Sequence, residues 1–145
     1  MRLLALGSLL ACLAVSGCSG DPQAAYCEVV EDHQAALSDV AASEDAGALF
    51  GALDIYDDLH AAAPRDIADE WAAVLEPLRR LEQVLTDHGV DPSTYAADAP
   101  PADLDVEGRD AIEAAARTVG SEPTVTAMAS VEQHALDVCG TPLSR

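Results

Sequence analysis

The stretch from Asp66 to His88, DIADEWAAVLEPLRRLEQVLTDH, has the clearest periodicity in the chain. Its apolar residues recur at alternating steps of four and three: Ile67, Trp71, Val74, Leu78, Leu81 and Leu85. This spacing places the side chains on one face of an α-helix and is typical of the seam of a helix bundle. Gly89 follows directly, and glycine commonly ends a helix. We therefore expect a helix over about 66–88 that packs against other helices.

Two amphipathic stretches precede this helix. Asp21 suits an N-cap and Pro22 a first turn, so a helix is expected from Pro22 to about Ala42. Ser43-Glu44-Asp45 is a second start signal, for a helix that is expected to end near Ala63. The apolar stripes of the two helices are Tyr26, Val29, Val30, His33, Leu37 and Val40, then Leu49, Phe50, Leu53, Tyr56 and Leu59.

The C-terminal part contains a linker and two further helical stretches. Residues 90–106 are rich in Pro, Ala and Asp, and a linker of this length is either functional or loose; we expect it to be loose. A short helix is expected from Glu107 to Val119. Ser121 then suits the cap of a last helix that ends at Cys139-Gly140. The apolar residues of that last helix are Val125, Met128, Val131, Leu136 and Val138.

Together these stretches predict an all-α fold: an up-down bundle of four to five helices over 22–140, with a tail at 141–145. In an up-down four-helix bundle, the start of the first helix and the end of the last lie at the same end. That arrangement requires the last two helical pieces to act as one broken element. If they fold back as separate antiparallel helices, the last helix ends at the opposite end of the bundle from the start of the first, unless the linker crosses the bundle.

The N-terminus has the pattern of a secretory signal peptide. Met1-Arg2 supplies a positive charge, and Leu3 to Val15 is an apolar run too short to span a bilayer comfortably. The run ends in Val15-Ser16-Gly17-Cys18, which resembles the lipobox of bacterial lipoproteins. The resemblance implies diacylglycerol transfer to the Cys18 thiol and cleavage between Gly17 and Cys18. Residues 1–17 would then be the signal peptide and 18–21 a short lipidated tether.

Two other interpretations of this region stay open. Leu9-Leu10-Ala11-Cys12 is also box-like, but it would shorten the apolar run and leave three further cysteines, an odd number for disulfides. Ordinary cleavage after Ser16, without lipid, is the second alternative. The lipid implied at Cys18 carries at least two acyl chains, enough for stable anchoring.

The remaining cysteines predict a disulfide. Of the four in the chain, Cys12 leaves with the signal peptide and Cys18 is lipidated, so Cys27 and Cys139 are left. Two leftover thiols usually pair in an oxidising exported compartment. The alternative is a redox or metal pair, although the chain contains no Cys-x-x-Cys motif.

The charge of the chain excludes some partners. It has 26 acidic and 7 basic residues, no lysine, and a formal net charge of −19. Such a surface repels the phosphates of nucleic acid and does not favour lying flat on anionic lipid. The acidity serves solubility, or it attracts cations or a basic partner.

The side chains that commonly carry chemistry form no recognised motif. Four histidines, His33, His60, His88 and His134, are spread along the chain, mostly beside acids. A di-metal carboxylate bundle needs Glu-x-x-His on two helices, and Asp57 with His60 supplies one approximate half. Histidines converging across helices remain an alternative for zinc or copper, and His33 is expected to be a hydrogen-bonded core residue. We expect no catalytic residues, no metal ligands and no cofactor, because no nucleophile or phosphate-loop motif is present.

Several of these stretches together resemble a family, the small helical lipoproteins of actinobacteria. The residues that carry the resemblance are Val15-Ser16-Gly17-Cys18, Tyr26-Cys27, Ala63-Pro64-Arg65-Asp66-Ile67 through Trp71, and Val138-Cys139-Gly140. The resemblance implies a helical bundle with the disulfide, and it implies no activity.

These observations support one functional hypothesis and one alternative. The first is a lipid-anchored protein on the extracytoplasmic face of the cell membrane, a binding or structural accessory protein that presents an acidic helical surface to another envelope protein. The alternative is a carrier of a small ligand or metal, using the bundle interior, the histidines or the 90–106 linker. No nucleic acid is expected as a partner.

Overall fold

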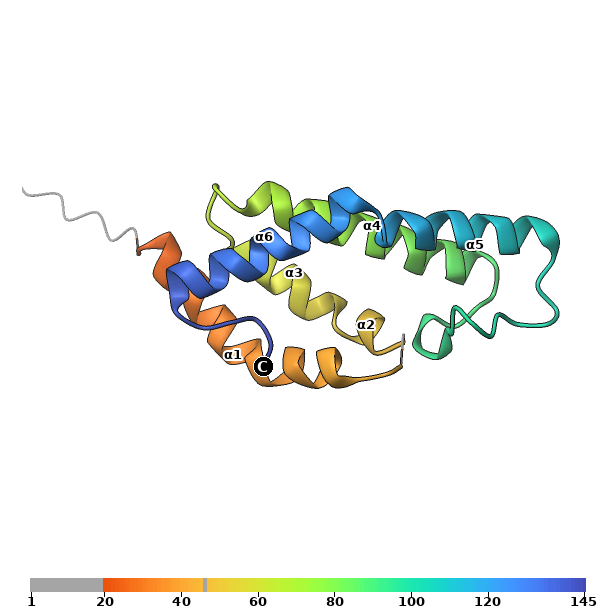
Figure 1. The fold of residues 1–145 in the computed structure, drawn as a ribbon, viewed down its shortest axis with the longest axis horizontal. Coiled ribbons are helices and arrows are strands. Elements are labelled where there is room, and N and C mark those ends of the chain that lie inside the picture. The colour runs from red at the N-terminus through yellow and green to blue at the C-terminus, as the bar shows by residue number, and fades with distance from the viewer. Residues whose placement is uncertain (1–19, 46) are drawn as a thin grey trace, which may run out of the picture.

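The protein is all-α over residues 20–45 and 47–145, which the computed structural model describes. This part holds six α-helices and one 3-10 helix, shown in Figure 1. The helices are α1 (Pro22–Ala42), α2 (Gly47–Gly51), α3 (Leu53–Ala62), α4 (Ala68–Asp87), η1 (Pro92–Thr94), α5 (Val106–Val119) and α6 (Glu122–Cys139). The predicted fold class is therefore confirmed.

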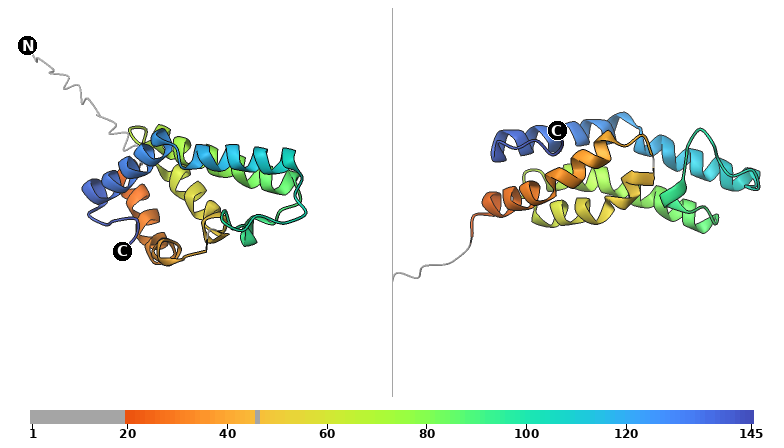
Figure 2. Two further views of the ribbon diagram at one scale, coloured as in Figure 1. Left: turned by 45° about the vertical axis from the view of Figure 1, so that its right-hand side comes forward. Right: turned by 90° about the horizontal axis from the view of Figure 1, so that it is seen from below.

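Four of the helices form a ring around the core. Helix α1 contacts α3 and α6, and α4 contacts the same two helices from the opposite side. Helices α5 and α6 follow one another end to end along α4 (Figure 2), separated only by Gly120 and Ser121. The two last pieces thus act as one broken element, and the end of α6 lies beside the start of α1.

Local signals explain where the helices begin and end. The Asp21 side chain accepts a hydrogen bond from the Gln23 N–H at 3.0 Å, as predicted for an N-cap. Gly89, with φ +72°, follows α4, and Gly140, with φ +65°, follows α6. Glycine enters this left-handed region without the penalty of a Cβ atom, so both helices stop where the sequence predicts. The second predicted helix is broken at Ala52 into α2 and α3.

The core forms around the face predicted for α4. Ile67, Trp71, Val74, Leu78, Leu81 and Leu85 are all buried. The largest fully buried side chains are Trp71, Tyr26, Leu59, Leu85, Val30 and Val131, which come from four different helices. Burying each large apolar side chain contributes about 1.5–3 kcal/mol, so this shared core holds the ring together.

The buried face of α6 differs in part from the predicted one, of which Val131 is buried and Met128 packs against the core. Val125 and Leu136 are 58% and 47% exposed. The buried residues are Thr124, Ala127, Val131 and Ala135. Small side chains on this face let α6 lie close to its neighbours, and Val125 and Leu136 are turned away from the core.

The 90–106 segment is not loose throughout. Val90 and Tyr95 are buried, and the Tyr95 ring packs edge-on against Phe50 of α2 with centroids 6.5 Å apart. Helix η1 also contacts α4. The first half of the segment is therefore part of the packed structure.

Candidate functional site

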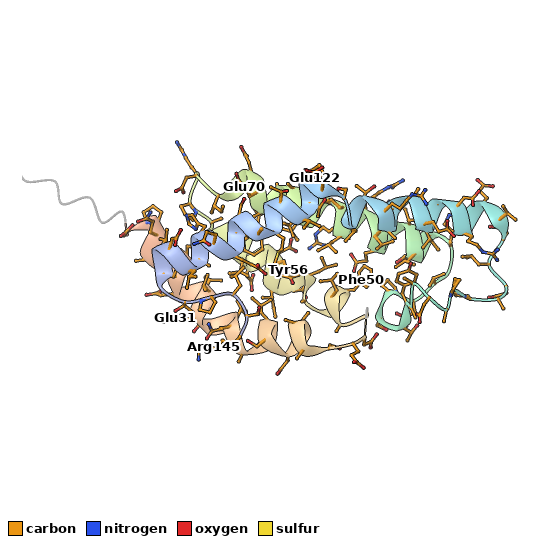
Figure 3. The ribbon with its side chains drawn as sticks, in the orientation of Figure 1. Glu31, Phe50, Tyr56, Glu70, Glu122 and Arg145 are labelled. Carbon is orange, nitrogen blue, oxygen red and sulfur yellow. A yellow bond between two sulfur atoms is a disulfide. The ribbon has the colours of Figure 1, made fainter. Side chains whose placement is uncertain are left out.

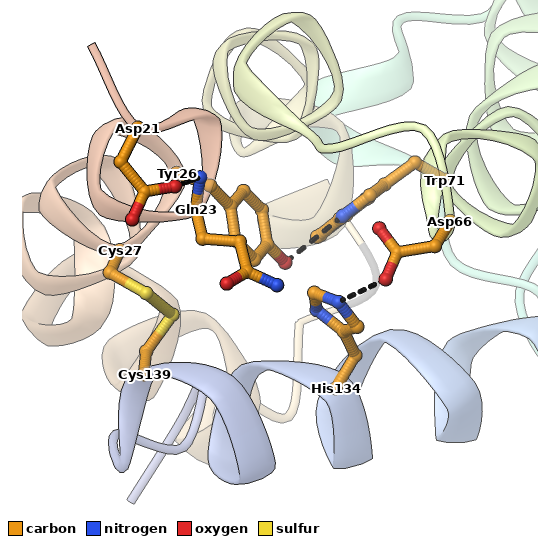
Figure 4. The surroundings of a disulfide bond; sticks show 8 residues. All are labelled: Asp21, Gln23, Tyr26, Cys27, Asp66, Trp71, His134 and Cys139. Carbon is orange, nitrogen blue, oxygen red and sulfur yellow. Dashed lines mark hydrogen bonds and ion pairs between the residues drawn. A yellow bond between two sulfur atoms is a disulfide. The ribbon is translucent and has the colours of Figure 1, made fainter.

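A disulfide joins the two ends of the described chain. Cys27 of α1 is bonded to Cys139 of α6, with their Cα atoms 5.2 Å apart and a sequence separation of 112 (Figure 4). The predicted pairing is confirmed. The bond fixes one end of α1 against one end of α6.

A buried polar cluster lies beside this bond. The Trp71 Nε1–H donates to the Tyr26 hydroxyl at 3.1 Å, and the His134 ring meets the Tyr26 ring edge-on at 5.6 Å. His134 Nε2 lies 3.6 Å from Asp66 Oδ2, within ion-pair range but too far for a hydrogen bond. Burial raises the pKa of Tyr26, and the hydrogen bond from Trp71 offsets part of this rise. The cluster ties α1, α4 and α6 together.

From the disulfide, α1 and α6 diverge (Figure 1). The 141–145 tail runs back between them, and its Leu143 side chain is only 2% exposed. The Gln34 side-chain amide donates to the Pro142 carbonyl at 2.6 Å, and the Arg145 N–H donates to Ser38 Oγ at 3.0 Å. The tail is therefore packed against α1 and fills the narrow part of the space.

The wider part of the space is an open groove, which we name the α1–α6 groove. It consists of a cavity of about 340 Å³ that α1 lines and a second cavity of about 360 Å³ that lies between α4 and α6. Leu49, Tyr56, Met128 and Glu132 line both, so the two cavities are adjacent. Figure 3 shows Tyr56 of α3 in the space between α1 and α6.

One end of the groove is strongly apolar. Val119, Val125, Met128 and Ala129 line it from the α5–α6 element, together with Thr124. Val74 and Leu78 of α4 line it from the core side. Exposed Val125 thus faces a cavity and not open solvent alone, which explains why a large apolar side chain stands outside the core.

The charged side chains of the groove are all acidic. Glu44 and Asp45 line the end near α1, and Glu132 lines both cavities. Burial raises the pKa of the Tyr56 hydroxyl, and the negative charge of Glu132 raises it further. An apolar floor with a few polar groups at its mouth is the usual composition of a small-molecule site.

The other residues singled out in the sequence do not converge. His33 Nε2 lies 3.3 Å from Asp58 Oδ2 in a partly exposed position, so His33 is not the core residue that was predicted. Asp57 pairs with Arg79 of α4, not with His60. Over residues 20–45 and 47–145, no group of three or more His, Cys, Asp or Glu side chains is placed to hold a metal ion. Cys18 lies outside the described residues.

Sequence reasoning assigned several groove residues, among them Tyr56, Val125 and Met128, to the apolar stripes of the bundle, and it did not predict the groove. Val125, Met128, Ala129 and Glu132 recur at steps of three, one and three, which marks a face of α6. The buried face, Thr124, Ala127, Val131 and Ala135, has a helical spacing too. The available signal was that α6 carries two apolar stripes, whereas burial against the core needs only one.

Comparison of the chain with models of protein families, with curated proteins and with solved structures finds no match. Among the described residues, no helix combines the length and apolar character needed to cross a membrane.

Proposed function

We propose that the protein is a binding protein that holds an apolar small molecule in the α1–α6 groove. The groove itself carries the proposal, because its two adjacent cavities of about 340 and 360 Å³ each lie within the usual size range of ligand sites. Its lining of Leu, Val and Met side chains favours an apolar ligand. A purely structural accessory protein has no need of such a cavity, so the groove favours the carrier function.

We further propose that the protein is anchored through lipid on Cys18 at the extracytoplasmic face of the membrane. Helix α1 begins at Pro22, and the three residues between Cys18 and Pro22 span about 10 Å when extended. Since Cys27 lies in the first turns of α1, the disulfide end would stand nearest the bilayer. A ligand that partitions into the membrane would then reach the groove over a short distance.

A Cys18→Ser variant is expected to move from the membrane fraction to the soluble fraction.

The binding experiment uses Nile red, a neutral apolar fluorophore. The wild-type protein is expected to enhance its fluorescence saturably, with one site per chain. In Ala129→Trp an indole fills the apolar end of the groove, and affinity is expected to fall at least tenfold. Ala36→Trp, at an exposed position of α1 outside the groove lining, is the matched control and is expected to bind like wild type. Equal binding by both variants would contradict the proposal.

A further inference from the structure

We propose that the ligand of the α1–α6 groove is a cationic amphiphile, with an apolar body in the groove and a positively charged head at Glu132. This inference rests on the proposed function and adds the chemical class of the ligand. It is carried by the charge of the groove lining together with the position of Glu132 at the junction of the cavities.

The apolar body belongs at the α4–α6 end. There the lining is Val74, Leu78, Val119, Val125 and Met128, and the one acid is Glu132 at its border. A hydrocarbon chain placed at this end covers side chains that are otherwise left to water, Val125 above all, which is 58% exposed.

The head group is selected by charge. Glu132 lines both cavities of the groove and also the neighbouring one between α6 and the tail. No arginine and no histidine lines the two cavities of the groove, and over the described residues Glu132 and Glu44 form no ion pair. An anionic head, such as a carboxylate or phosphate, would therefore meet unpaired carboxylates, whereas a cationic head pairs with them.

Tyr56 lies beside Glu132 and lines both cavities. Its side chain is buried and its ring packs against Trp71, with the centroids 6.0 Å apart. The selection of a cation therefore comes from the Glu132 carboxylate, which stands next to an apolar surface.

The test compares three probes that share a ten-carbon chain: decyltrimethylammonium, decyldimethylamine oxide and decyl sulfate. Binding to the full-length protein is measured by isothermal titration calorimetry below the micelle concentration, at pH 8 and near-physiological salt, where long-range attraction to the acidic chain is screened. The cation is expected to bind at one site at least tenfold more tightly than the uncharged amine oxide, and the sulfate most weakly.

Two glutamates of α6 provide a matched pair of variants. Glu132→Gln is expected to remove most of the preference for the cation, and a urea midpoint close to the wild-type value shows that the variant is folded. Glu122→Gln removes the same charge from the first turn of α6 (Figure 3), outside the groove lining, and is expected to keep the preference.

The outcomes separate this inference from the proposed function. Equal binding of all three probes, or an equal loss of preference in both variants, would overturn the cationic head while leaving an apolar groove in place. Failure of every probe, including Nile red, would overturn the proposed function and this inference with it.

Discussion

The chain contains three tyrosines, and all three are buried: Tyr26, Tyr56 and Tyr95. Burial raises the pKa of each phenol, because the charged phenolate loses its hydration. Nearby carboxylates act in the same direction on Tyr56 and Tyr95. Each hydroxyl thus stays protonated in the folded protein at a pH where the unfolded chain already releases its proton.

This difference predicts a loss of stability in alkali. Below about pH 10 the tyrosines are protonated in both states, so they add no pH dependence. Above about pH 10 the unfolded chain binds fewer protons than the folded one, and the free energy of unfolding falls as pH rises. Lysine is absent and Cys27 and Cys139 are bonded, so these groups do not obscure the effect.

Urea unfolding followed by circular dichroism, at pH 8 and at about pH 10.5, measures this change. The urea midpoint is expected to be lower at the higher pH, and the drop is expected to be smaller in Tyr26→Phe, which has one phenol fewer to titrate. An unchanged midpoint in the wild-type protein would show that the buried phenols do not resist ionisation.

At the scale of elements, a glycine lets α2 approach η1 closely. A Cβ atom at Gly47 would lie 2.1 Å from the Ser93 carbonyl oxygen, a backbone atom that cannot rotate away. Gly51, four residues later in the same short helix, has open space around the corresponding position. The contact brings the first half of the 90–106 segment against α2, where Tyr95 packs on Phe50.

Substitution of these two glycines by alanine is therefore expected to have opposite effects. Gly47→Ala forces η1 away from α2 and is expected to cost about 1–3 kcal/mol, as for other overpacked positions. Gly51→Ala meets no atom within 4 Å and replaces the glycine at the last position of α2 by a stronger helix former, so it is expected to be neutral or to stabilise by up to about 1 kcal/mol. Urea midpoints of both variants provide the comparison, and a similar loss in both would refute the close-approach explanation.

At the scale of the whole molecule, the disulfide governs how far α1 and α6 diverge. It closes a loop of 112 residues, which includes nearly all of the described chain. In the chain-entropy account, a cross-link over about 100 residues stabilises the folded state by about 4–5 kcal/mol, and native disulfides commonly deliver about 2–5 kcal/mol. The same bond also holds together the ends of α1 and α6 from which the two helices diverge, and the groove lies in the space that they leave.

The double variant Cys27→Ser/Cys139→Ser is expected to lose about 2–5 kcal/mol of stability and to bind Nile red more weakly. Its urea midpoint should not respond to reductant, whereas the wild-type midpoint should fall to a similar value when the disulfide is reduced. A wild-type protein equally stable in both redox states would show that packing alone holds the two helix ends together.

The sequence by itself determined the fold class, most helix ends and the disulfide. The stripe from Ile67 to Leu85 is so regular that only one face of α4 can be buried, and Gly89 ends that helix because glycine alone enters its backbone conformation without strain. Cys27 and Cys139 were paired because they are the two thiols left once Cys12 and Cys18 are assigned to the signal peptide and the lipid, and the structure shows the bond.

Only the tertiary structure decided which face of α6 is buried, and with it the α1–α6 groove. Helix α6 offers two neighbouring stripes, and side-chain size favoured the wrong residues, Val125 and Leu136. The choice depends on how closely α6 approaches the buried Trp71 and Tyr26, and close approach selects small residues such as Ala127 and Ala135. A groove is the space left by that packing between elements distant in sequence, so no local pattern specifies it.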